Sequence, residues 1–133
     1  MEALPTTLNS FFTNISSSAP VSSGQPRGLY NFILEIRNSS TKEEERSRVD
    51  KELANIRQKF AQSSTLSSYQ KKKYVWKMCY IYMLGYEVDF GHLECISLLG
   101  SSKFQEKAVG YMAIALLLKP GTSCFLTMHG LTN

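Results

Sequence analysis

The chain has 133 residues, of which 43% are hydrophobic and 20% are charged, as expected for one globular domain or part of a larger one. Its net charge of +4 and its pI near 9.0 are too modest to indicate a basic stripe that binds nucleic acid. The three cysteines, Cys79, Cys95 and Cys124, lack CxxC spacing. Two of them lie in apolar helical segments, which indicates buried thiols in a reducing compartment. The longest apolar run, residues 111–118, is far too short to span a bilayer.

Residues 1–26 differ in composition from the rest of the chain. They are rich in serine and threonine, and Glu2 is their only charged residue. The segment lacks the features of a secretory signal or a transit peptide, and we expect a disordered extension. We therefore divide the chain into this extension at residues 1–26, a helical region at residues 27–119 and a tail at residues 120–133.

Hydrophobic periodicity predicts five helices and no strand. The first helix has an apolar face at spacings of three, four and seven, formed by Leu29, Phe32, Ile33 and Ile36. Gly85 and Gly100 are expected just past two helix ends, and Pro120 blocks the last helix. The helices are expected near residues 28–37, 42–60, 69–84, 90–99 and 103–118. Short polar loops between them indicate an all-α fold of antiparallel helical repeats, the start of an α-solenoid.

Capping signals set the expected starts of three of these helices. Thr41 followed by Glu44, and Ser102 followed by Gln105, each match a capping box. Asp89 is the expected N-cap of the fourth helix, and a hydrophobic staple would join Val88 to Leu93. The last helix has more apolar surface than its one preceding neighbour can cover, so we expect marginal stability or self-association.

Three consecutive lysines, Lys71, Lys72 and Lys73, begin the third helix. Basic side chains there oppose the positive end of the helix dipole, at roughly 0.3–1 kcal/mol each when exposed. Lys77 shares a face with Lys73, because the two are four residues apart. Such a cluster makes a good anion site, and phosphate suits it best. A solvated start of a buried helix explains the same pattern, and composition does not decide between the two interpretations.

Short motifs give little support for catalysis. The triplet at residues 89–91 spells the metal-binding triplet of protein kinases, but no glycine-rich loop or catalytic loop accompanies it. His92 with Glu94 resembles the start of a zinc deaminase signature, but the paired cysteines downstream are absent. We expect a protein that is not an enzyme and that needs no metal or cofactor.

Four longer segments are similar to a known family. They read RGLYNFILEIRN, RVDKELANIRQKF, YQKKKYVWKMCYIYMLGYEVDFGH and FQEKAVGY. In this order and spacing they resemble the N-terminal trunk of the alpha-adaptins, the large subunits of the clathrin adaptor complex at the plasma membrane. The resemblance covers residues 27–118 and implies a HEAT- or armadillo-like α-solenoid.

The resemblance also implies the site residues. Alpha-adaptins bind phosphatidylinositol bisphosphate headgroups through a basic N-terminal site, whose matching positions here are Arg27, Gly28, Lys59, Tyr69, Lys71, Lys72, Lys73, Tyr74 and Lys77. A further family arginine, matched by Arg37, lies beside the small sigma subunit and contacts the acidic residue of dileucine cargo signals. The implied partners are these membranes, cargo signals, the sigma and other adaptor subunits and, indirectly, the clathrin coat.

The expected function is phosphoinositide-dependent membrane recruitment and cargo sorting in clathrin-mediated endocytosis. The implied location is cytoplasmic, peripheral at coated pits of the plasma membrane. Both ends depart from the family pattern, so we expect a truncated or alternatively spliced product, or an incomplete gene model. A nonfunctional product is one alternative. A weak nucleic-acid-binding helical module is another, with Tyr69, Tyr74 and Trp76 as candidate stacking residues beside the lysines.

Overall fold

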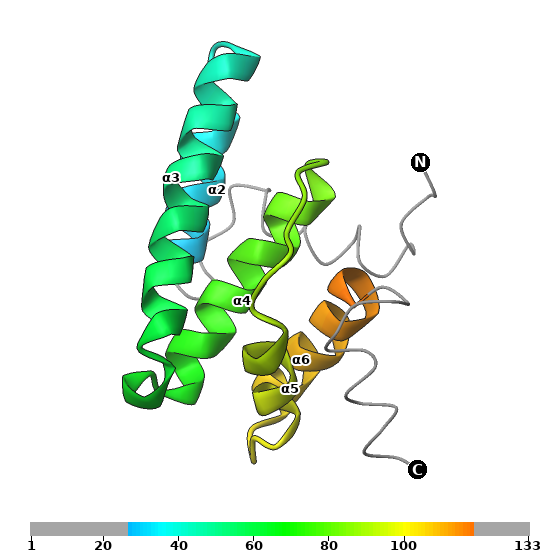
Figure 1. Ribbon diagram of the computed structural model, residues 1–133. Coiled ribbons are helices and arrows are strands. Elements are labelled where there is room, and N and C mark those ends of the chain that lie inside the picture. Colours follow the sequence, from blue (N-terminus) through cyan, green and yellow to red (C-terminus); the bar gives the residue numbers. More distant parts are fainter. Residues whose placement is uncertain (1–26, 119–133) are drawn as a thin grey trace. The chain divides into compact units, whose positions relative to one another are not determined.

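The computed structural model describes residues 27–118, with the side chain of Arg27 left out, and this part of the chain is helical (Figure 1). Five α-helices form there, together with one 3-10 turn and no strand, so the all-α prediction is confirmed. The elements are α2 (Arg27–Arg37), α3 (Lys42–Ala61), η1 (Ser63–Thr65), α4 (Ser68–Met83), α5 (His92–Leu99) and α6 (Phe104–Leu117). The predicted extension at residues 1–26 and tail at residues 120–133 lie outside the described residues.

The chain divides into two compact units, Met1–Asp50 and Lys51–Asn133. In the first unit, α2 buries the apolar face that its sequence predicts, at Leu29, Phe32, Ile33 and Ile36. Val49 of α3 is also fully buried. The amphipathic pattern of this segment therefore correctly predicted both the helix and its buried face.

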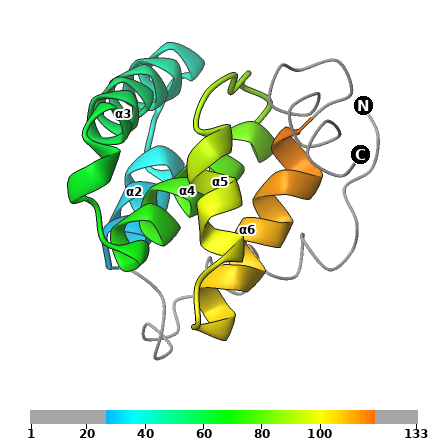
Figure 2. The same cartoon turned by 60° about the horizontal axis from the view of Figure 1, so that its bottom comes forward.

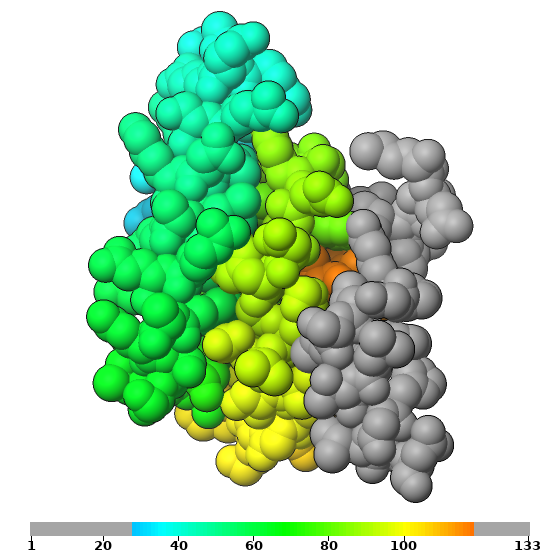
Figure 3. Space-filling view, in the orientation of Figure 1, coloured from blue at the N-terminus to red at the C-terminus, as the bar shows by residue number. Residues whose placement is uncertain are grey.

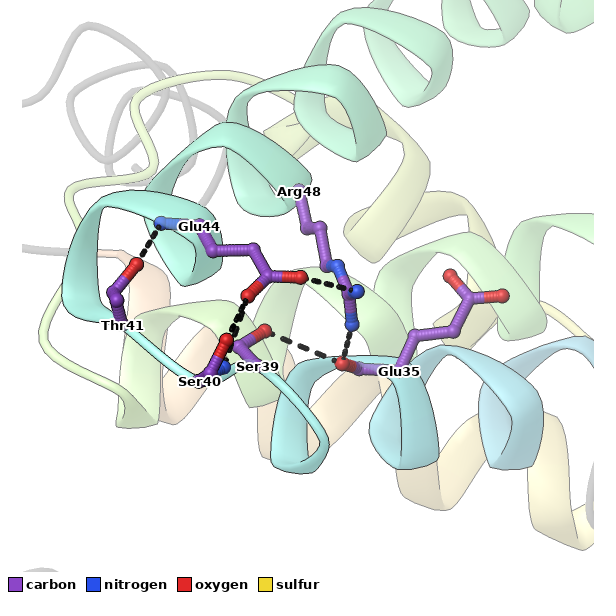
Figure 4. Close-up of polar contacts among 6 residues, drawn as sticks. All are labelled: Glu35, Ser39, Ser40, Thr41, Glu44 and Arg48. Carbon is purple, nitrogen blue, oxygen red and sulfur yellow. Dashed lines mark hydrogen bonds and ion pairs between the residues drawn. The ribbon is translucent and has the colours of Figure 1, made fainter.

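The connection between α2 and α3 is held by a polar network (Figure 4). The backbone N–H of Glu44 donates to Thr41 Oγ1 at 3.1 Å, which confirms Thr41 as the cap. The Glu44 carboxylate accepts from the backbone N–H of Ser40 at 2.9 Å and from the Ser40 hydroxyl at 2.8 Å. A capping box would require it to accept from the backbone N–H of Thr41 instead. Arg48 donates to that carboxylate at 2.6 Å and to the carbonyl oxygen of Glu35, which joins α3 to the end of α2.

Acidification should loosen this connection. The Ser40 backbone N–H, its hydroxyl and the Arg48 guanidinium lower the pKa of Glu44 in the fold. A carboxyl whose pKa is depressed by folding stabilises the folded state above its unfolded pKa, and this contribution is lost as the pH falls through its folded pKa. We expect Glu44→Gln to remove part of the fall in stability below about pH 4.5, measured as the urea midpoint against pH. Glu43→Gln, an exposed carboxyl in the same helical turn, is the control, and equal pH profiles for Glu44→Gln and wild type would contradict this role.

In the second unit, α4, α5 and α6 all contact one another, and α5 and α6 run antiparallel side by side (Figure 2). Their shared core includes Met78, Ile81, Leu98, Val109 and Ala113, each at most 2% exposed. The expectation that α6 has a single neighbour is wrong, because α4 and α5 both cover it. Tyr111 of α6 remains 64% exposed.

Helix starts in this unit differ from their predictions. The fourth helix begins at His92 and not after Asp89, because Gly91 is its N-cap and takes a left-handed conformation with φ of 83°. Leu93 is then 72% exposed, so the predicted staple does not form. At α6 the N-cap is Lys103 without a side-chain cap, which contradicts the box of Ser102 and Gln105.

Candidate anion-binding site on helix α4

The start of α4 is capped by side chains that the sequence analysis missed. Ser67 Oγ accepts from the backbone N–H of Gln70 at 3.2 Å, and the Gln70 side chain accepts from the backbone N–H of Ser67 at 3.0 Å. This capping box satisfies donors that an anion at the helix terminus would otherwise bind. Because α4 begins at Ser68, Lys71 lies in its second turn, where the dipole acts weakly. The box therefore makes the lysine side chains, and not the capped helix end, the main candidates for binding an anion.

The three consecutive lysines have different surroundings. Lys71 Nζ donates to the hydroxyl of Ser97 on α5 at 3.2 Å. Lys72 is only 4% exposed and lies with its ammonium 5.0 Å from the centre of the Tyr69 ring. Lys73 is half-buried, and its ammonium lies 4.6 Å from the centre of the Tyr74 ring. The contacts of Lys71 and Lys73 are therefore with neutral groups, a hydroxyl and an aromatic ring.

Burial changes the protonation of Lys72. Loss of contact with water lowers the pKa of its ammonium, the nearby Glu106 carboxylate works in the opposite direction, and Lys103 adds to the lowering. Glu106 is itself 3% exposed and accepts a hydrogen bond from the hydroxyl of Ser101. A second anion close to Lys72 would favour its charged form, because it would compensate for the lost hydration.

Lys77, one turn further along α4, forms an ion pair. Its Nζ lies 2.7 Å from Glu52 Oε1 of α3, and the two side chains are 10% and 18% exposed. The ammonium of Lys77 is also 5.7 Å from the centre of the Tyr74 ring. Local sequence patterns did not indicate Glu52, Ser97 or Glu106 as partners of the lysines, because pairs so far apart in the chain leave no local pattern.

The remaining predicted site residues fall into both units. Lys59 is exposed in the last turn of α3 and belongs to the second unit, as do Tyr69, Tyr74 and the four lysines of α4. Arg27 and Gly28 are the first two residues of α2, and Arg37 is its exposed last residue. These three belong to the first unit.

The aromatic side chains beside the lysines differ in exposure. Tyr69 is 46% exposed, whereas Tyr74 and Trp76 are 6% and 5% exposed. The ring of Tyr74 packs edge-on against Phe60, with ring centres 6.2 Å apart. The expectation that Tyr74 and Trp76 offer stacking surfaces is therefore wrong, because both rings belong to the core.

The segment with the kinase-like triplet has a structural role. The guanidinium of Arg57 lies 4.5 Å from the centre of the Phe90 ring, and Arg57 pairs with Asp89 at 3.7 Å. Within residues 27–118, no group of three or more histidine, cysteine, aspartate or glutamate residues is placed to hold a metal ion. No helix among the residues described is long and apolar enough to cross a membrane.

Comparison with known proteins places this helical chain in a family. Residues 45–133 match the family model described as the adaptin N terminal region. Over 92 residues, or 69% of this chain, the sequence is 54% identical to the AP-2 complex subunit alpha-2 of Dictyostelium discoideum and 58% identical to the AP-2 complex subunit alpha-1 of Arabidopsis thaliana. It is 38% identical over 110 residues, or 80% of this chain, to the AP-1 complex subunit gamma-1 of Mycosarcoma maydis.

The matched parts are short in relation to these relatives. They cover 9% of each of the two alpha subunits and 12% of the gamma subunit. The chain thus spans about a tenth of the length of the relatives it matches. The family match and the all-helical fold agree, and the chain belongs to the adaptin N-terminal family.

Proposed function

We propose that this chain serves in membrane recruitment by a clathrin adaptor large subunit, and that its α4 lysines bind phosphoinositide headgroups. The observation that carries the proposal is the run of Lys71, Lys72 and Lys73 in the second turn of a capped helix, in a chain 54–58% identical to AP-2 alpha subunits. Lys59 and Tyr69 belong to the same unit and would complete the site.

The surroundings of the lysines suit a ligand with several phosphates. Lys71 donates to a hydroxyl that water can replace, and Lys73 lies over the ring of Tyr74, so neither charge is neutralised by these contacts. Lysine ammonium groups bind phosphates as point charges, with three donors each. Each basic residue near an anionic surface contributes about 1 kcal/mol. A bisphosphate headgroup would therefore gain from several lysines at once.

The rest of the proposal follows the similarity to AP-2 alpha subunits. In such a complex, Arg37 would receive the acidic residue of dileucine cargo signals beside the sigma subunit. By the same similarity, Arg27 and Gly28 are further candidates for contact with a headgroup. The chain would then act without catalysis, bound peripherally to coated pits of the plasma membrane, with the other adaptor subunits linking it to clathrin.

Binding of nucleic acid is the second candidate function, and the exposures of the aromatic rings count against it. Only Tyr69 of the three candidate aromatics exposes as much as 46% of its surface. Stacking on aromatic side chains supplies about 1–3 kcal/mol per base in proteins that bind single strands. A lysine cluster without this stacking holds a polynucleotide by charge alone, which salt screens.

A competition experiment separates the two functions. At physiological salt, soluble inositol hexakisphosphate should displace the chain from vesicles containing phosphatidylinositol bisphosphate, because it offers the same phosphates to the same lysines. A single-stranded oligonucleotide should bind only at low salt. Micromolar oligonucleotide binding at physiological salt, lost in Tyr69→Ala, would favour the nucleic-acid function instead.

A further inference from the structure

The ion pair between Lys77 and Glu52 sets Lys77 apart from the other lysines of the site. Its N–O distance of 2.7 Å is that of a charge-assisted hydrogen bond, and both side chains are largely shielded from water. By contrast, the contacts of Lys71 and Lys73 are a hydroxyl and an aromatic ring, which leave the lysine charge in place. Lys77 is therefore a basic residue whose charge the protein already neutralises.

A phosphate and the Glu52 carboxylate would compete for the same ammonium. Lys77 lies within 5.7 Å of the Tyr74 ring, and Lys73 lies on that ring as well, so a headgroup at Lys73 comes close to the pair. As the phosphate approaches, it gains from Lys77 and is repelled by Glu52. Because the pair is shielded from water, neither interaction is screened as strongly as between exposed charges.

We propose that Glu52 limits the affinity of this site, as an internal counter-ion that a phosphoinositide headgroup must displace from Lys77. The inference rests on the proposed function and adds a residue that determines affinity without touching the lipid. In the ligand-free state Glu52 holds the Lys77 side chain in place and cancels its charge. Binding then exchanges a carboxylate for a phosphate at one ammonium group.

The test compares vesicle binding of charge-matched variants of the full chain. Glu52→Gln keeps the side chain's shape and removes its charge. Its affinity for vesicles containing phosphatidylinositol bisphosphate should rise about three- to fivefold, because that is the effect of one charge at an anionic surface. Glu87→Gln removes the same charge from an exposed residue of the α4–α5 connection and should leave binding unchanged. In a Lys77→Gln background, Glu52→Gln should have no effect.

Each alternative outcome is distinct. Unchanged or weaker binding by Glu52→Gln overturns the inference, because Glu52 would then only position Lys77. Equal tightening by Glu52→Gln and Glu87→Gln, or tightening that persists without Lys77, also overturns it, because net charge alone would explain the effect. If the wild-type chain does not bind these vesicles, both the proposed function and this inference are overturned.

A second measurement requires no substitution. The NMR signal of the Lys77 ammonium, assigned by its loss in Lys77→Gln, should shift when soluble inositol trisphosphate saturates the wild-type chain. A shift of the Lys77 signal on addition of inositol trisphosphate supports the exchange of the Glu52 carboxylate for a phosphate. A signal that stays in place while those of Lys71 and Lys73 move overturns it.

Discussion

Gly91→Ala should destabilise the second unit by about 2–5 kcal/mol, the sum of backbone strain and overpacking. Gly91 has φ of 83°, a conformation that an L-residue adopts only with strain. A Cβ atom added there would lie 2.6 Å from Met78 Cε and 2.8 Å from Phe60 Cε2. Met78 is fully buried and Phe60 is 8% exposed, so both side chains would have to shift within the core.

Gly100→Ala is the matched control, because it makes the same change at the other end of α5. Gly100 has φ of −83°, and the nearest atom to an added Cβ is the Ser97 carbonyl oxygen at 3.6 Å, an ordinary contact. Urea unfolding followed by the fluorescence of Trp76, the chain's one tryptophan and a buried residue of this unit, measures both variants. Equal midpoints for the two variants would contradict the strain at Gly91.

The position of Gly91 explains why the sequence misplaced the start of α5. The connection between α4 and α5 crosses the surface of this unit (yellow-green in Figure 3) and then turns inward onto α4. Asp89 has the composition of an N-cap, but the left-handed turn at Gly91 lets the helix begin only afterwards. The contact of Gly91 with Met78 and Phe60 decides the boundary, and it is not local in sequence.

Local patterns predicted the helices well and the site's internal partners poorly. The spacing of Leu29, Phe32, Ile33 and Ile36 gave a buried face, because helical periodicity alone determines which side chains share a side. The lysine triplet was visible because its three members are consecutive in the sequence. The burial of Lys72 and Lys77 could not be seen in the sequence, because other helices cover these two side chains.

Glu52 shows the limit of local reasoning most clearly. It lies 25 residues before Lys77, on a largely polar helix that carries many acidic and basic residues. Nothing in its neighbourhood distinguishes it from the other glutamates of α3. Only packing brings its carboxylate to the lysine, and with it the competition that we propose for the headgroup site.

Replacing Lys71, Lys72 and Lys73 together with glutamine should weaken binding to phosphoinositide vesicles roughly a hundredfold, at about 1 kcal/mol per charge. The loss should not come from unfolding. Burial lowers the pKa of Lys72, so the fold disfavours its charged form, and a neutral side chain removes that cost. Lys42, Lys51 and Lys107 are exposed, so replacing these three with glutamine removes the same charge for comparison.

Co-sedimentation of the wild-type chain and these two triple variants, with vesicles containing phosphatidylinositol bisphosphate at physiological salt, is the most direct measurement. The wild type and the variant at Lys42, Lys51 and Lys107 should sediment with the vesicles. The variant at Lys71, Lys72 and Lys73 should remain in the supernatant, although its urea midpoint is unchanged. Undiminished sedimentation of that variant would show that the lysines of α4 do not form the lipid site.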